Sequence, residues 1–146
     1  MSEKNDYQTF LANIRRPGDR IDRIENMTGD GIPDVNYCFD GVEGWIEFKS
    51  PIEPKRESTP LFGSNHRMRQ SQMNWHLRQR QAGGISYIMI CTNRRWMLID
   101  GKRADEINDS TVGELIDLAD WTAQRPFSSV PWPSSWMRLR EVLRCK

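Results

Sequence analysis

The dipeptide Asp40-Gly41 constrains the fold of this chain more than any other feature. Apolar and polar residues alternate on either side of it, over residues 35–40 and 42–50. Asp-Gly between two such runs predicts an antiparallel β-hairpin with a two-residue turn, because both central residues of that turn need a positive φ, which these types tolerate. The turn also sets the register of the two strands, so that Asp34 is opposite Glu47.

This register predicts a cluster of charged residues on one face of the hairpin. Asp34, Glu47 and Lys49 share that face, with opposed Cβ atoms roughly 4.5 to 5.5 Å apart. Two carboxylates at this distance repel each other unless a proton or a cation lies between them, and their oxygens suit Mg²⁺ or Mn²⁺. The pattern therefore predicts a divalent metal site beside a lysine, and the solvated face of an ordinary hairpin is the alternative. The other face is apolar and consists of Val35, Phe39, Val42, Ile46 and Phe48.

The formal net charge of +1 conceals a positive segment. From Lys49 to Gln81 there are seven Lys or Arg residues and two acids, a local net charge of +5. Phosphate contacts supply most of the non-specific affinity for nucleic acid, so this segment predicts a surface for a polyanionic substrate. A solvated charged helix and loop is the alternative. The candidate nucleic-acid-binding residues are Lys55, Arg56, Arg67, Arg69 and Arg78.

Length and composition favour one compact enzyme domain. The chain has 146 residues and 37% hydrophobic content, without an apolar run long enough for a membrane span or a signal-peptide segment. We therefore expect a soluble cytoplasmic protein. Its three cysteines have neither CxxC nor zinc-site spacing, which predicts reduced thiols. The sequence around Gly29-Asp30-Gly31 lacks the spacing of a phosphate loop, so no nucleotide cofactor is expected.

The remaining pattern predicts an α/β fold. The expected order is helix, three strands, helix, two strands, followed by two further helices. We expect a core over about 1–101 and a C-terminal helical extension over about 102–146, with a long loop at 51–67 that is poorly ordered without substrate. The expected helices cover residues 3–15, 69–82, 112–121 and 136–143, and the expected strands cover 20–26, 35–40, 42–50, 85–91 and 96–99.

Two short motifs in the predicted hairpin resemble a known nuclease signature. Pro33-Asp34 and Glu47-Phe48-Lys49 match the PD-(D/E)XK superfamily, and the surroundings over residues 20–100 are similar to its VRR-NUC branch. The supporting features are Gly29-Asp30-Gly31-Ile32, Gln72, Trp75 and Gly83-Gly84. This resemblance implies a mixed sheet in the order α-β-β-β-α-β-β flanked by helices, and a DNA endonuclease dependent on Mg²⁺ or Mn²⁺. Standalone domains of this size resemble phage-type, Holliday-junction-resolvase-like enzymes, which are expected to act as homodimers on branched DNA.

The motif residues have expected roles in phosphodiester hydrolysis. Asp34 and Glu47 would ligate the metal, and the resemblance implies the backbone carbonyl of Phe48 as a third ligand. Lys49 would orient a water or hold the scissile phosphate. Gln72, for which Gln70 is a rival, would turn its amide toward Lys49 or a phosphate.

The metal site has further candidate acids. Glu25 is one, because it precedes the glycine-rich turn. Related nucleases also take an acid from the first helix, where Glu3 and Asp6 are available without a convincing position.

Other functions stay open at this point. His66 and His76 do not occur in a Ser-His-Asp or Cys-His order, so we assign them no catalytic role, and Trp75 is expected in the core rather than stacked on a base. A flap, nicking or restriction-like nuclease would satisfy the same motif. A non-catalytic nucleic-acid-binding module is the second alternative, because the positive segment alone would suffice for it.

Overall fold

The structure is a computed structural model that describes residues 2–24, 31–63, 66–125 and 134–145. The expected order of helices and strands up to residue 100 is confirmed. The elements are α1 (Glu3–Ile14), β1 (Arg20–Arg23), β2 (Val35–Phe39), β3 (Val42–Lys49), α2 (Gln70–Gln81), β4 (Ser86–Cys91), β5 (Arg95–Asp100), η1 (Gly101–Glu106), α3 (Val112–Leu118), β6 (Trp121–Gln124) and α4 (Ser134–Leu143).

The strands form one six-stranded mixed sheet in the order β1-β2-β3-β4-β5-β6. Among the described strands, β3 and β4 are the one parallel pair of neighbours, and α2 provides the crossover that a parallel pair requires. The predicted hairpin register is confirmed, since Val35 pairs with Ile46. Asp40 and Gly41 have φ values of 51° and 82°, as the two-residue turn demands. The predicted α/β class with a mixed sheet flanked by helices is therefore observed.

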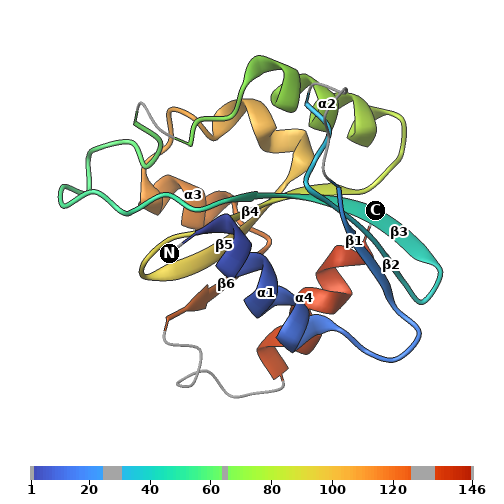
Figure 1. The fold of residues 1–146 in the computed structure, drawn as a ribbon. Helices are drawn as coiled ribbons and strands as arrows, with labels where there is room; N and C mark the ends of the chain where they lie inside the picture. The colour runs from blue at the N-terminus through green and yellow to red at the C-terminus, as the bar shows by residue number, and fades with distance from the viewer. Residues whose placement is uncertain (1, 25–30, 64–65, 126–133, 146) are drawn as a thin grey trace.

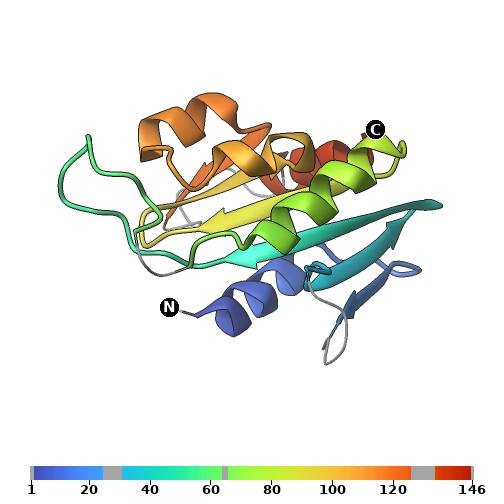
Figure 2. The same cartoon turned by 90° about the horizontal axis from the view of Figure 1, so that it is seen from above.

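Helices cover both faces of the sheet (Figures 1 and 2). On one face α1 and α4 enclose the apolar side of the hairpin, where Val35, Phe39 and Ile46 are fully buried. On the other face α2, η1 and α3 pack over the second core, which contains Ile88 and Met97. The charged face of the hairpin thus lies under α2 rather than in open solvent.

The predicted C-terminal extension is not wholly helical, which corrects the sequence analysis. Residues 121–124 form β6, which pairs antiparallel with β5, so the sheet reaches beyond residue 101. The expected helix over 112–121 accordingly ends at Leu118. Trp121 and Ala123 are buried while Thr122 and Gln124 are exposed, an alternation typical of a strand. Four residues are too few for this period to outweigh a preceding helical pattern in the sequence.

The loop after β3, which is expected to be poorly ordered without substrate over 51–67, contacts the rest of the protein through several of its described residues. The backbone N–H of Leu61 donates to the carbonyl of Ser110, and both Leu61 and Phe62 are buried. Nearer β3, the Glu53 carboxylate accepts a hydrogen bond from the hydroxyl of Thr92 at 2.5 Å. Residues 51–63 therefore have contacts of their own with the second core.

Two expectations from composition can be compared with the described residues. Cys38, Cys91 and Cys145 are all free cysteines, as predicted. Within the described ranges, no helix has the length and apolar character needed to cross a bilayer.

Candidate active site

Asp34, Glu47 and Lys49 meet at the carboxyl end of β3. Glu47 and Lys49 are on the face of β3 that packs under α2 and are 3% and 8% exposed. Asp34 directly precedes β2, and its Oδ2 accepts a hydrogen bond from the backbone N–H of Phe48 at 3.0 Å. This bond fixes the Asp34 carboxylate against β3, so the structure brings together the three residues that the hairpin register predicted.

Gln72 in the first turn of α2 holds the lysine. Its Oε1 accepts one hydrogen bond from Nζ of Lys49 at 3.3 Å and another from the backbone N–H of Arg69 at 2.9 Å. The rival Gln70 is exposed and donates to Asn74 on its own helix. The amide of Gln72 thus faces Lys49, which is one of the two expected orientations.

Gly31 allows the segment before Asp34 to approach α2 closely. A Cβ atom at this position would overlap the backbone carbonyl of Ser71, and Gly31 also has a φ of 88°. Both the conformation and the contact exclude a larger residue. Gly31 therefore allows Asp34 to lie under the start of α2.

The electrostatic environment of Glu47 is unfavourable for a charged carboxylate. Burial raises the pKa of Glu47 well above its usual range, the negative charge of Asp34 raises it further, and Lys49 opposes both effects. Among the described residues, Oε1 of Glu47 has no hydrogen-bond partner. A cation at this position would both compensate the charge and satisfy the buried oxygen.

Glu3 joins the cluster from the first turn of α1, where sequence reasoning found no convincing position for it. Burial raises the pKa of Glu3, the charge of Asp34 raises it further, and the nearby Lys49 and His66 lower it. The negative charge of Glu3 also contributes to the raised pKa of Glu47. This proximity depends on how α1 docks across the end of the sheet, a long-range contact that local patterns do not encode.

Asp6, the other candidate on α1, has a different set of partners. Its side chain accepts a hydrogen bond from the Ser50 hydroxyl at 2.6 Å and forms an ion pair with Arg125 at 2.8 Å. Ser50 directly follows Lys49 in the chain. Asp6 therefore ties α1 and β6 to the end of β3, and we assign it a positioning role for Glu3 and Lys49. Glu25, the remaining candidate acid, lies outside the described residues.

The donor set at this site suits a hard divalent cation. Asp34 and Glu47 supply carboxylate oxygens. The backbone N–H of Phe48 points toward Asp34. In an extended strand the N–H and the carbonyl of one residue point to the same side of the strand, so the carbonyl of Phe48 also points to the side on which Asp34 lies. In the described part of the chain, no three His, Cys, Asp or Glu side chains are placed to hold one metal ion. Two carboxylates with a backbone carbonyl are thus the protein ligands that the geometry offers.

The predicted basic residues lie in several places. Lys55, Arg56, Arg69 and Arg78 are exposed. Arg67 donates to the carbonyl of Phe62 and lies 3.7 Å from Asp109. Arg78 is six residues after Gln72 on α2, about 9 Å farther along the helix axis.

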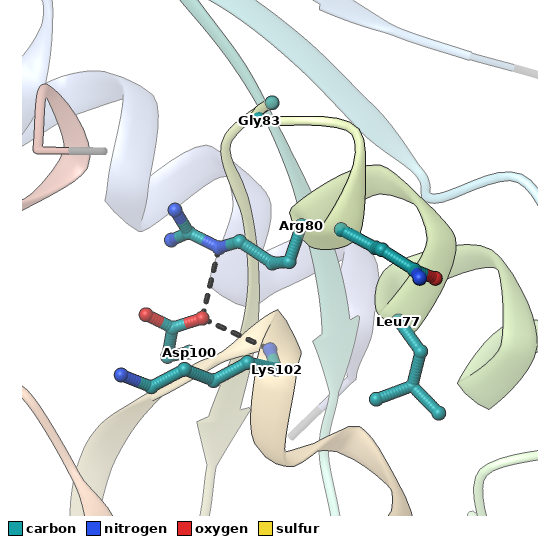
Figure 3. A pocket seen from close by; sticks show the side chains of 7 residues that line it. Leu77, Arg80, Gly83, Asp100 and Lys102 are labelled. Carbon is teal, nitrogen blue, oxygen red and sulfur yellow. Dashed lines mark hydrogen bonds and ion pairs between the residues drawn. The ribbon is translucent and has the colours of Figure 1, made fainter.

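Arg80 belongs to the positive segment but is engaged inside the protein. Its Nε lies 2.8 Å from Asp100, which also accepts a hydrogen bond from the backbone N–H of Lys102 (Figure 3). These residues line a cavity of about 440 Å³ at the C-terminal end of α2, and the side chain of Arg80 is only 10% exposed. This ion pair links α2 to the end of β5. Because the Arg80 side chain is paired and largely buried, Arg80 does not contribute to a surface for nucleic acid.

The histidines and Trp75 have structural environments. His76 is a fully buried residue of α2, and burial lowers its pKa to about 3, so its ring stays neutral at physiological pH. His66 is exposed. Trp75 is half-buried, with its ring edge-on to Trp45 at 5.4 Å between centroids. Trp75 thus packs against a neighbouring ring, but it is only half-buried and belongs to neither hydrophobic core, where the sequence analysis expects it.

Comparisons with known proteins find similarity among solved structures. No protein-family model matches the sequence, and no curated protein matches it. One of these solved structures is Archaeoglobus fulgidus Hjc, described as a Holliday junction resolvase from an archaeal hyperthermophile. The two share 16% sequence identity over 68% of this chain and 75% of Hjc, with a TM-score of 0.45. The case for a function therefore rests on the residues of the site.

Proposed function

We propose that this protein is a metal-dependent endonuclease that hydrolyses phosphodiester bonds in DNA. The observation that carries the proposal is the convergence of Asp34, Glu47 and Lys49 under α2, with the lysine hydrogen-bonded to Gln72. Burying two neighbouring carboxylates costs stability unless a cation compensates them. Such an arrangement has a chemical purpose in a hydrolase and none in the packing of a sheet.

The proposed cofactor is Mg²⁺ or Mn²⁺, bound by Asp34, Glu47 and the carbonyl of Phe48. When bound, such an ion lowers the pKa of a coordinated water and neutralises charge that develops on the phosphate. The unpartnered Oε1 of Glu47 is the atom in this chain that most needs that ion.

The side chains around the carboxylates would do the rest of the chemistry. Lys49 places a positive charge beside the scissile phosphate and can donate a hydrogen bond to a phosphate oxygen or to the attacking water. Gln72 restricts the position of the ammonium through the 3.3 Å hydrogen bond. The Glu3 carboxylate can accept a hydrogen bond from a water at the site.

A non-catalytic nucleic-acid-binding module is the weaker candidate. Its function would require positive charge, whereas here the carboxyl groups of Glu3, Asp34 and Glu47 stand close together at the point where the sheet would meet a phosphate, and the charge of Asp34 raises the pKa of the other two. Carboxylates repel DNA in the absence of a metal. The cluster therefore favours catalysis over simple binding.

The preferred DNA and the assembly state are further parts of the proposal. On the resemblance of the motif, we propose that residues 1–146 act as a single nuclease domain, with branched DNA such as Holliday junctions as substrate and a homodimer as the active form. A twofold axis would present two sites to two strands. The exposed residues proposed to contact DNA are Lys55, Arg56, Arg67, Arg69 and Arg78.

A substrate panel tests this proposal. Purified protein is incubated with labelled four-way junction, matched linear duplex, flap and single-stranded DNA, in Mg²⁺, Mn²⁺ or EDTA, and Asp34→Asn serves as the inactive control. Metal-dependent cutting of the junction in preference to the duplex supports the nuclease and its preference for branched DNA. Cutting of flaps or duplex alone retains the nuclease and rejects the junction preference. No cutting of any substrate would reject the nuclease and leave the binding module.

A further inference from the structure

We infer that a basic pocket outside the catalytic cluster binds the phosphodiester backbone of the same DNA strand, a few nucleotides away from the scissile phosphate. The assignment of DNA as its ligand rests on the proposed function. The pocket has a volume of about 500 Å³ and lies between the loop after β3, the turn between β4 and β5, and the start of α3. None of the catalytic residues lines it. We call it the loop pocket.

The ion pair between Glu53 and Arg95 forms one side of the loop pocket. The Glu53 side chain is 7% exposed and accepts hydrogen bonds from the hydroxyl of Thr92 and from Nε of Arg95, the latter at 3.0 Å. The backbone N–H of Glu53 donates to the side chain of Asn93. These bonds join the loop to the β4–β5 turn, so the pocket has a defined shape before any ligand binds.

The net charge of the residues that line the loop pocket is positive. Because Glu53 neutralises Arg95, the free charges lining the pocket are those of Lys55, Arg56 and Arg94, opposed by the exposed Glu57. Across the described ranges, no hydrogen bond or ion pair links these three cationic side chains to an acid. Unpaired cations around a preformed pocket are suited to a phosphate anion.

The topology places the loop pocket on the path of a strand bound at the catalytic cluster. β3 and β4 are parallel neighbours, so Lys49 at the end of β3 and Arg94 after the end of β4 are at the same edge of the sheet. The loop projects from that edge in both overall views (Figures 1 and 2). Glu53 follows Lys49 by four residues, a reach of at most about 14 Å. At about 3.4 Å of helix axis per phosphate on one strand, this corresponds to roughly four nucleotides.

Arg94 provides the most direct test, because its side chain makes no hydrogen bond or ion pair with any described residue, whereas Asn93 and Arg95 are both bonded to Glu53. Only its backbone is engaged, through its N–H to the hydroxyl of Thr92 and its carbonyl to Arg125. Binding of a fluorescein-labelled duplex and a four-way junction is measured by anisotropy in EDTA over a range of salt concentrations. The variants are Arg94→Ala, Arg94→Lys and, as a matched control, Arg138→Ala, which removes an exposed arginine of α4.

The loss of one phosphate contact should make the plot of log affinity against log salt concentration less steep by about 0.9. This change corresponds to binding that is roughly eightfold weaker at 0.1 M salt and about twofold weaker at 0.5 M salt. We expect this for Arg94→Ala, whereas Arg94→Lys and Arg138→Ala keep the wild-type slope. An unchanged slope for Arg94→Ala would overturn the inference, as would an equal loss in Arg94→Lys, since that would indicate a structural role. The cleavage panel is read separately: an inactive wild type with the expected slopes would reject the nuclease and support the phosphate site.

Discussion

Replacing Glu47 by Gln should stabilise the metal-free protein at neutral pH. The folded protein binds a proton at Glu47 more tightly than the unfolded chain does, because burial and Asp34 raise the pKa of this group. The stability that this group contributes is therefore fully present below its ordinary pKa of 4.5 and is lost as the pH rises above that value. Glutamine has nearly the same shape but does not ionise, so the stability of Glu47→Gln should not fall with rising pH for this reason.

The size of the effect follows from the pH difference. Each pH unit above the ordinary pKa of 4.5 costs about 1.4 kcal/mol while the folded carboxyl remains protonated, so the cost reaches about 3 kcal/mol at pH 7. A buried glutamine amide without a full set of partners loses about 1 kcal/mol. The net gain expected for Glu47→Gln at pH 7 is about 2 kcal/mol in the free energy of unfolding, whereas at pH 4.5 the variant should be up to about 1 kcal/mol less stable than wild type.

Urea unfolding in EDTA at pH 4.5 and pH 7 measures this difference. The matched control is Glu43→Gln, which changes an exposed glutamate of the same strand whose side chain is 65% exposed and should stay within about 0.5 kcal/mol of wild type. Addition of Mg²⁺ at one hundred times its Kd should stabilise wild type by about 2.7 kcal/mol and Glu47→Gln by much less. A Glu47→Gln variant that is less stable than wild type at pH 7 in EDTA would refute the reasoning.

Two further substitutions test the residues that position the site. Gln72→Ala should lower the single-turnover cleavage rate about tenfold to a hundredfold by releasing Lys49, with metal affinity unchanged; Gln70→Ala, the control, should cut at the wild-type rate. Asp6→Asn should cost about 2 kcal/mol in urea unfolding, because the largely buried Arg125 loses its charged partner. It should also slow cleavage through the displacement of α1, and equal stability of Asp6→Asn and wild type would contradict the anchoring role.

The hairpin could be predicted from sequence because its determinants are local. Asp40-Gly41 fixes the turn, and the period of two fixes the faces, so the meeting of Asp34 with Glu47 follows from pattern alone. The placement of Gln72 was predicted from the resemblance to a known motif. Its contact with Lys49 additionally needs the close approach of Gly31 to α2, which appears only in three dimensions.

Long-range docking explains what the sequence left undetermined. Glu3 reaches the site because α1 docks across the sheet, with Phe10 packed against Phe48 and with Asp6 bonded to Ser50 and Arg125, residues far apart in the chain. β6 was missed because four alternating residues give a weak signal after a helical stretch. The segment from Lys49 to Gln81 was judged by its total charge, which cannot reveal that Arg80 is neutralised by Asp100.

The central claim is that Asp34, Glu47 and Lys49 form a catalytic site for phosphodiester hydrolysis. Single-turnover cleavage of labelled four-way junction by wild type and Lys49→Ala, with Mg²⁺ or EDTA, tests it most directly. The account predicts cleavage by wild type that requires Mg²⁺, and a loss of at least about a hundredfold in Lys49→Ala with unfolding in urea little changed. Cleavage by Lys49→Ala at the wild-type rate would contradict it.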